Sequence, residues 1–201
     1  MAQQEKIYYI VLIVLMLLGI VATFVFRKVT DPVKLRRRVE KALLRYARPR
    51  KYRVLNNVAF DTRKGKVTVD HLLVGYFGVL FVGDLVLDGD YYGEMDDENW
   101  ICSQTERSTE TTTRVGTQPN PVRLGRLAME AARDRCARAD IFNLPMEAIA
   151  VSAYKSTDFV ITGSKGYAMA LPALRTYLLR SWFDKDTGLN VDAVCDALLQ
   201  E

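Results

Sequence analysis

Two short apolar runs separated by a glycine-flanked turn constrain the fold of this chain more than any other feature. They lie within Lys66–Trp100, and Gly75-Tyr76-Phe77-Gly78 separates them. Each run is rich in β-branched residues and is shorter than a typical helix, which indicates buried strands. We therefore expect a β-hairpin with most of both faces buried. Its apolar residues are Val67, Val69, Leu72, Val74, Val79, Leu80, Phe81, Val82, Leu85, Val86 and Leu87.

Two carboxylates, Asp70 and Asp84, interrupt this hairpin where a buried strand would ordinarily carry Val or Ile. An ionised side chain there needs a partner, a metal or water. A two- or four-residue connection pairs Asp70 with Gly83 and turns Asp84 to the other face of the sheet. An odd loop, or a bulge at Gly83, instead places the two carboxylates opposite each other, close enough to share a metal. The hairpin is therefore where we expect any chemistry.

The only histidine, His71, follows Asp70 directly. On a regular strand it faces away from Asp70, because successive side chains alternate between the two faces. No second histidine or cysteine is spaced to complete a metal site with it. We therefore predict a structural histidine with protein partners. The three cysteines, Cys102, Cys136 and Cys195, likewise show no metal-ligand spacing, and we expect them to be reduced.

Several short motifs stand around the hairpin in a defined order. They are Val69-Asp70-His71, Phe77-Gly78-Val79, Gly93, Trp100 and Asn120-Pro121. Over roughly residues 38 to 155 this order resembles the nuclease-related domain (NERD) family. The resemblance implies an α/β fold of the restriction-endonuclease-like class, with a mixed sheet flanked by helices. It also implies a metal-dependent nuclease in which Asp70 and Asp84 are catalytic and hold Mg²⁺.

The chain departs from the family pattern at three polar positions. Where the family carries Glu-x-Lys, this chain has Asp84-Leu85-Val86, so the lysine that assists the attacking water is replaced by valine. Arg36-Arg37-Arg38 stands where members carry Gly-Glu, with Glu40 the only nearby acid, and Leu124 stands where members often carry glutamine. These departures favour a non-catalytic or weakly active binding or scaffold module. The alternative is an Mg²⁺-dependent nuclease acting on DNA or RNA with a relocated cation.

An apolar run near the beginning of the chain, Ile7–Phe26, holds 20 consecutive residues without a charge. At 1.5 Å per residue a helix of this length matches a hydrocarbon core of about 30 Å. The run is too long for a signal peptide and lacks an Ala-x-Ala cleavage site. We therefore predict a single-pass transmembrane helix over residues 7–26, preceded by a short tail over residues 1–6.

A basic segment, Arg27–Arg53, follows directly, with 12 Lys or Arg and only two acidic residues. Positive charge stays on the cytoplasmic side of a cell membrane, so we expect the globular domain, residues 54–201, to be cytoplasmic. The segment suits either anionic lipid headgroups or nucleic acid. Its place beside the apolar run favours lipid. Asp31-Pro32 predicts the start of a helix that runs through Tyr46.

The remaining elements follow from periodicity and end signals. We expect one sheet of five or six strands, a helix opened by Asn120-Pro121, and two closing helices. The acidic stretch from Asp88 to Glu98 is predicted to be a solvated loop, because its spacing does not fit a calcium-binding loop. Thr105–Pro119 is predicted to be a polar loop. The other expected strands are Tyr52–Phe60, Trp100–Gln104, Met146–Ala153 and Phe159–Thr162, and the closing helices are Leu171–Phe183 and Asn190–Leu199.

Overall fold

The computed structural model describes residues 12–20, 31–106, 111–163 and 166–200. The chain divides into two units, Met1–Leu35 and Arg36–Glu201. In the first unit, residues 12–20 are helical, and the rest of the predicted membrane segment Ile7–Phe26 lies outside the described residues. Within the described ranges no helix has the length and apolar character needed to cross a membrane. The transmembrane helix therefore stays a prediction.

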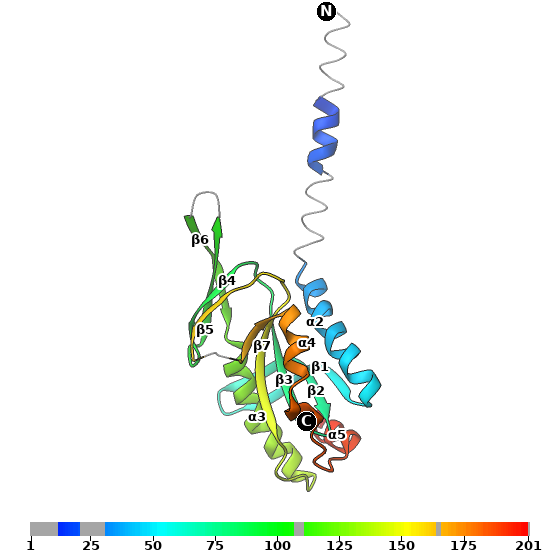
Figure 1. Ribbon diagram of the computed structural model, residues 1–201. Coiled ribbons are helices and arrows are strands. Elements are labelled where there is room, and N and C mark those ends of the chain that lie inside the picture. The colour runs from blue at the N-terminus through cyan, green and yellow to red at the C-terminus, as the bar shows by residue number, and fades with distance from the viewer. Residues whose placement is uncertain (1–11, 21–30, 107–110, 164–165, 201) are drawn as a thin grey trace, which may run out of the picture. The chain divides into compact units, whose positions relative to one another are not determined.

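The main sheet of the second unit contains five strands in the order β1-β2-β3-β7-β9 (Figure 1). Strands β1 (Arg53–Thr62), β2 (Gly65–Gly75) and β3 (Gly78–Leu85) form an antiparallel meander. Strands β7 (Met146–Ser152) and β9 (Ala168–Ala170) extend it in parallel from β3. The sheet is therefore mixed, as expected.

The predicted hairpin is confirmed as β2 and β3. Gly75 pairs with Gly78, so the connection is the two-residue turn Tyr76-Phe77. All eight residues of β3 are buried, which explains why its sequence is almost continuously apolar. Gly78 has φ of 124°, and a Cβ atom there would overlap the carbonyl oxygen of Pro145. Glycine therefore permits both the turn and the close approach of the chain that leads into β7.

Helix α3 (Pro121–Arg138) covers one face of this sheet and connects back to β7. Asn120 is its N-cap, with a side-chain oxygen that accepts hydrogen bonds from the backbone N–H groups of Val122 and Arg123. Gly125 lies against Ala148 of β7 and Phe81 of β3, so small residues bring the helix close to the strands. The predicted helix start at Asn120-Pro121 is thus confirmed. Helix α5 (Val191–Leu199) packs beside α3.

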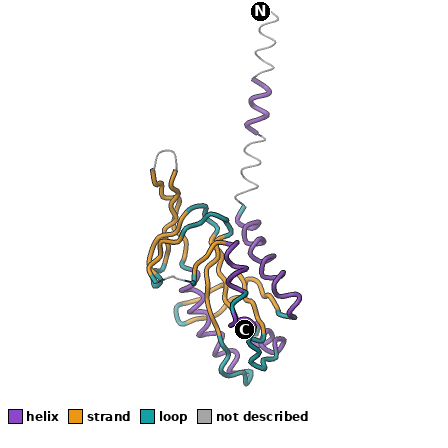
Figure 2. The backbone as a smooth tube through the Cα atoms, in the orientation of Figure 1, coloured by secondary structure: helices purple, strands orange, loops and turns teal. Residues whose placement is uncertain are grey.

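Helices α2 (Pro32–Ala47) and α4 (Leu171–Leu178) lie on the other side of the sheet from α3 (Figures 1 and 2). Val39, Leu43 and Ala47 form the buried stripe of α2. Single 3₁₀ turns, η1 (Arg48–Arg50) and η2 (Ser181–Asp184), follow the two helices. The helix predicted from Asp31-Pro32 is therefore confirmed, and the second unit is an α/β fold with helices on both faces.

A second, four-stranded sheet corrects three expectations. Its order is β6-β5-β4-β8. Strand β4 (Asp90–Glu94) lies within the stretch predicted to be an acidic loop, and β6 (Thr111–Pro119) occupies most of the predicted polar loop. Strand β5 (Asn99–Glu106) pairs with both, and β8 (Phe159–Thr162) pairs with β4 rather than with the main sheet. The side chains of β6 are mostly exposed, so backbone pairing with β5 defines this strand and leaves no apolar alternation to detect.

Gly83 provides a test of how tightly α3 is fixed against β3. A Cβ atom at this position would overlap the Cβ of Pro121, the first residue of α3. We expect Gly83→Ala to lower the free energy of unfolding by about 1–3 kcal/mol, because the helix start must shift. Urea unfolding followed by tryptophan fluorescence measures the change.

Gly116→Ala in β6 is the matched control for Gly83→Ala. Its Cβ would meet only the side chain of Leu87, at an ordinary 3.4 Å. An equal loss of stability in the two variants would show that Gly83 is not a packing constraint.

Candidate functional site

A closed chain of polar contacts begins and ends on α2, at Arg36 and Glu40, which lie one turn apart. Glu40 Oε1 accepts a hydrogen bond from Asn56 Nδ2 at 2.8 Å, and Asn56 Oδ1 lies 2.6 Å from His71 Nδ1. On the other branch, Arg36 Nη1 donates to Asp70 Oδ1 at 2.5 Å. Both branches lead from α2 into the sheet.

The two branches meet at Asp84 in the middle of the sheet. His71 Nε2 lies 3.0 Å from Asp84 Oδ2, and the backbone N–H of Asp84 donates to Asp70 Oδ2 at 2.9 Å. The contacts thus form a ring that joins α2 to β1, β2 and β3. We call it the Asp84 ring, and its six residues are Arg36, Glu40, Asn56, Asp70, His71 and Asp84.

A local break in strand alternation brings these side chains together. In β2 the residues packed in the core are Val67 and Val69 before the break, and Leu72 and Val74 after it. The β1 residue at the matching position, Asn57, has a left-handed backbone with φ of 52°. The alternation therefore advances by one residue, and Asp70 and His71 both face α2. The prediction that His71 faces away from Asp70 is wrong.

The connection between β2 and β3 also decides between the two geometries expected for the aspartates. The two-residue connection is confirmed, and β3 keeps regular pairing with β7 through Gly83, so no bulge lies there. Regular pairing of β2 with β3 ends at His71 and Val82. Beyond it, the Asp70 carboxylate accepts the N–H of Asp84. The irregularity therefore lies in β1 and β2, at Asn57 and Asp70. It does not lie in β3 at Gly83, where the sequence suggested a bulge.

Asp84 is the most deeply buried member of the ring, with a side chain that is 0% exposed. Its Oδ1 atom has no hydrogen-bond partner among the described residues. Burial raises the pKa of Asp84 from its ordinary 3.8 to about 6, while the hydrogen bond from His71 opposes this rise. The Asp70 side chain is 19% exposed and lies against Arg36.

The directions of the hydrogen bonds place a proton on Nδ1 of His71. Asn56 Nδ2 donates to Glu40, so Asn56 Oδ1 faces the ring and accepts a proton from His71 Nδ1. His71 Nε2 then shares one proton with Asp84 Oδ2. That proton is carried either by the imidazole, as a cation, or by the carboxylic acid. His71 is therefore a structural histidine with protein partners on both ring nitrogens, as predicted.

Gln118 is a member of the site that the sequence did not indicate. Its Nε2 donates to the carbonyl oxygen of Asp84 at 2.6 Å, and its Oε1 accepts from the backbone N–H of Val86 at 3.2 Å. Gln118 thus links the end of β3 to β6. No local spacing pointed to it, because the contact depends on the second sheet, which the sequence did not predict.

The other residues considered from the sequence lie outside the ring. Val86 contributes no polar side-chain atom beside Asp84. Leu124 is partly buried and packs against the core, and Lys66 is exposed at the far end of β2. Among the described residues, no lysine pairs with either carboxylate in the way that the family pattern calls for.

The arrangement does not fit a hydrated Mg²⁺ ion. Such an ion keeps several waters and takes oxygen ligands in octahedral geometry. Asp70 already has Arg36 and the N–H of Asp84 as partners, and Asp84 Oδ2 has His71. Asp84 Oδ1 remains, but it is buried beyond the reach of solvent. Across the described ranges no group of three or more His, Cys, Asp or Glu side chains could hold a metal ion.

The raised pKa of Asp84 predicts a specific pH dependence of stability. A carboxyl group whose folded pKa exceeds its unfolded pKa stabilises the fold below pH 3.8, and this contribution is lost as the pH rises through about 6. Asp84→Asn keeps a donor for His71 and removes the charge. As the pH rises from 4 to 6, we expect the stability of the variant to increase relative to that of wild type, by on the order of 1–3 kcal/mol. This difference should then persist up to pH 8. Urea unfolding across pH 4–8 measures the difference.

Asp134→Asn, an exposed change on α3, is the control for this pH series. A variant Asp84→Asn that is less stable than wild type at pH 8, with a difference independent of pH, would contradict the prediction. It would mean that an ionised Asp84 stabilises the ring.

Comparisons with known proteins agree with the motifs around the hairpin. The sequence model of the nuclease-related domain (NERD) matches residues 34–153, a range that includes most of α2, the whole Asp84 ring and α3. Neither the comparison with curated proteins nor the one with solved structures found a match. The family match spans more than half of the chain, and the chain therefore belongs to the nuclease-related domain family.

Proposed function

We propose that this protein is a membrane-anchored NERD module that binds or scaffolds rather than cleaves. The observation that carries the proposal is the occupation of both carboxylates by the protein's own groups. Arg36 lies on Asp70, and His71 lies on Asp84. Val86 takes the place of the family lysine. An attacking water at Asp84 would lack a free pair of carboxylates to hold the metal that lowers its pKa. It would also lack the family lysine, and the Arg36 cation is already paired with Asp70.

We further propose that the α/β fold is a variant of the restriction-endonuclease-like architecture. The mixed main sheet with helices on both faces supports this assignment. The second sheet, β6-β5-β4-β8, is an addition to that plan. In this proposal Ile7–Phe26 anchors the chain in the cell membrane, the second unit is cytoplasmic, and Arg27–Arg53 contacts anionic lipid headgroups. The uncharged run and the basic segment after it support this part.

The second candidate is an Mg²⁺-dependent nuclease that cleaves DNA or RNA at the cytoplasmic membrane face. It requires Arg36 to leave Asp70 and His71 to leave Asp84. The exposure of Arg36, whose side chain is 46% exposed, is the observation that favours such a movement. The burial of His71 and its second hydrogen bond to Asn56 oppose it.

Calorimetric titration of the full chain with Mg²⁺ and with Mn²⁺, in a neutral detergent, separates the two candidates. We expect no saturable heat up to millimolar metal, because Arg36 and His71 already neutralise the carboxylates. Asp70→Asn and Asp84→Asn should give the same flat titration as wild type. Asp134→Asn serves as the control for weak binding to surface carboxylates.

Saturable metal binding that both ring variants abolish and the surface variant retains would overturn the proposal. Assays of DNA and RNA cleavage would then follow, with the same three variants. A flat titration of a folded protein directs the search to binding partners.

A further inference from the structure

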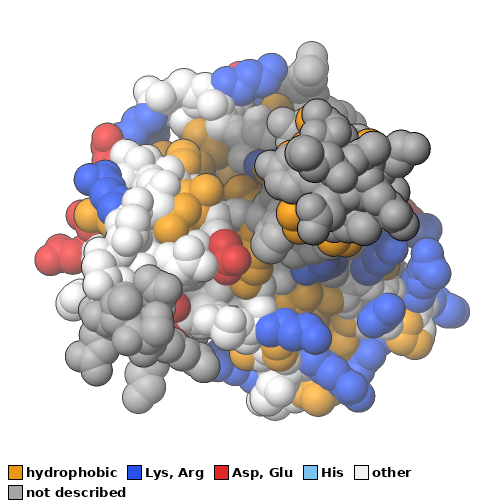
Figure 3. Space-filling view, turned by 90° about the horizontal axis from the view of Figure 1, so that it is seen from above, with side chains coloured by type: hydrophobic (Ala, Val, Ile, Leu, Met, Phe, Trp, Pro, Cys, Tyr) orange, Lys and Arg blue, Asp and Glu red, His pale blue; other side chains and the backbone are white. Residues whose placement is uncertain are grey.

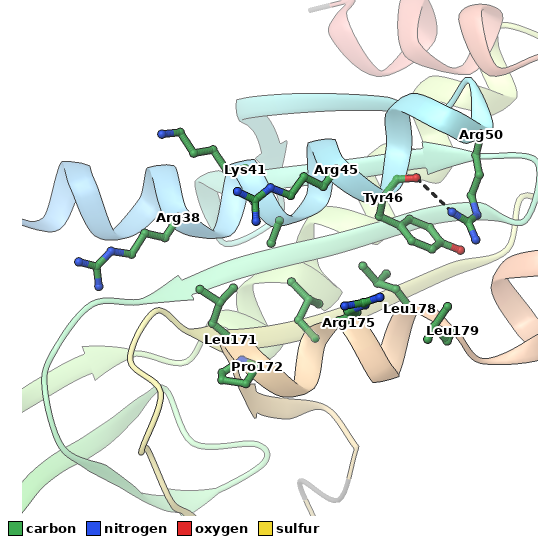
Figure 4. A pocket seen from close by; sticks show the side chains of 12 residues that line it. Arg38, Lys41, Arg45, Tyr46, Arg50, Leu171, Pro172, Arg175, Leu178 and Leu179 are labelled. Carbon is green, nitrogen blue, oxygen red and sulfur yellow. Dashed lines mark hydrogen bonds between the residues drawn. The ribbon is translucent and has the colours of Figure 1, made fainter.

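A groove of about 780 Å³ runs between α2 and α4 (Figure 4). This volume is in the range of small-molecule and cofactor sites. Its lining residues come from α2, η1 and α4, all within the second unit from Arg36 onward. The groove is separate from the Asp84 ring, because none of the six ring residues lines it.

Five basic side chains line this groove. Arg38, Lys41 and Arg45 project from α2, Arg50 follows in η1, and Arg175 faces them from α4 (Figure 4). The space-filling view shows basic side chains gathered on this side of the molecule with apolar patches between them (Figure 3). Among the described residues, the groove has no acidic lining residue.

The cations of the groove are not neutralised by the protein. Arg38, Lys41, Arg45 and Arg175 form no salt bridge with any carboxylate in the part of the chain that the structure describes. Like charges three or four residues apart on a helix repel each other. The groove therefore concentrates positive charge that an anion would relieve.

The floor of the groove is apolar. It is formed by four leucines of α4 and its end, Leu171, Leu174, Leu178 and Leu179. Leu174 and Leu178 are buried, whereas Leu179 is 60% exposed. A ligand that covered Leu179 would remove apolar surface from water.

Tyr46 stands where the cationic and apolar parts of the groove meet. Arg50 stacks over its ring at 4.0 Å from the centroid and donates to its carbonyl oxygen. The Tyr46 hydroxyl is buried and has no hydrogen-bond partner among the described residues. This hydroxyl has no accessible surface, so Tyr46 borders the groove through its ring and not through its oxygen.

We propose that the groove holds one anionic phospholipid, with its phosphate among the basic side chains of α2 and Arg175 and an acyl chain along the α4 leucines. This inference rests on the membrane location in the proposed function. The basic side chains favour an anionic ligand. The leucines favour a ligand that also has an apolar part, which a phospholipid has and a nucleic acid lacks. A nucleic-acid strand would need phosphate contacts along an extended path and open aromatic faces for its bases. Here the Tyr46 ring is already covered by Arg50.

The test uses the full chain in neutral detergent micelles that contain a phosphatidylglycerol with a photoreactive acyl chain. After illumination, the labelled peptides are identified by mass spectrometry. We expect labelling in α4, around Leu171–Leu179. Unlabelled phosphatidylglycerol should displace the probe, whereas phosphatidylcholine, inorganic phosphate and a single-stranded oligonucleotide should not.

Paired variants test the two halves of the groove. Arg45→Gln with Arg175→Gln should weaken probe binding roughly tenfold or more, since a basic residue near an anionic headgroup contributes about 1 kcal/mol. Leu179→Gln should reduce labelling of α4 through the acyl chain. The control is Arg37→Gln with Arg133→Gln, which removes the same charge from exposed positions outside the groove. It should bind the probe as wild type does.

Four results would overturn the proposal. They are equal competition by phosphatidylcholine, equal weakening by the control pair, displacement by the oligonucleotide, and labelling confined to residues 7–26. The last result would refute the groove while leaving the membrane role in place. A fifth result, the absence of any labelling by the photoreactive phosphatidylglycerol, would overturn both.

Discussion

Burial of the Asp84 carboxylate is the constraint on which the central part of this structure depends. A carboxylate in the middle of a sheet must be neutralised, hydrogen-bonded or protonated. Here His71 supplies the partner on one oxygen, and the other oxygen is left without one among the described residues. His71 can supply that partner only because Asn56 orients it, and Asn56 in turn is held by Glu40 of α2. A chain of hydrogen bonds thus links α2 to this one buried acid.

The Asp84 ring also explains how the chain can keep carboxylates at the family positions although we propose that it has lost nuclease activity. Removing one partner from a buried charged group is more destabilising than replacing the group and its partner together. Once Arg36 pairs with Asp70 and His71 shares a proton with Asp84, the carboxylates no longer need a metal to fold. Their presence at the family positions is therefore compatible with a structural role, and identity of residue type alone does not indicate catalysis.

Local signals in the sequence were enough for four of the five main-sheet strands and for α3, whereas the short strand β9 was not predicted. The Gly75-Tyr76-Phe77-Gly78 turn and the Asn120-Pro121 helix start act over a few residues, and both were predicted. The second sheet was missed because β6 is polar on both faces and is defined by pairing. In the site, the two aspartates were identified, whereas Asn56 and Gln118 were not, because their contacts join segments distant in sequence. Asn56-Asn57 within a strand was the one available signal, since asparagine is uncommon in strands and tolerates the left-handed backbone.

The arginines of α2 do not form one uniform basic patch, although the sequence presents them as one run. Residues 36 and 40 lie within about 40° of each other around a helix, whereas residues 38, 41 and 45 lie on the opposite side. Arg36 consequently pairs with Asp70 of the sheet, and Arg38, Lys41 and Arg45 line the groove. A loss of charge at Arg36 therefore acts on the sheet, and a loss of charge at Arg45 acts on the groove. One helix thereby serves two separate electrostatic sites, one closed by the protein itself and one open to a ligand.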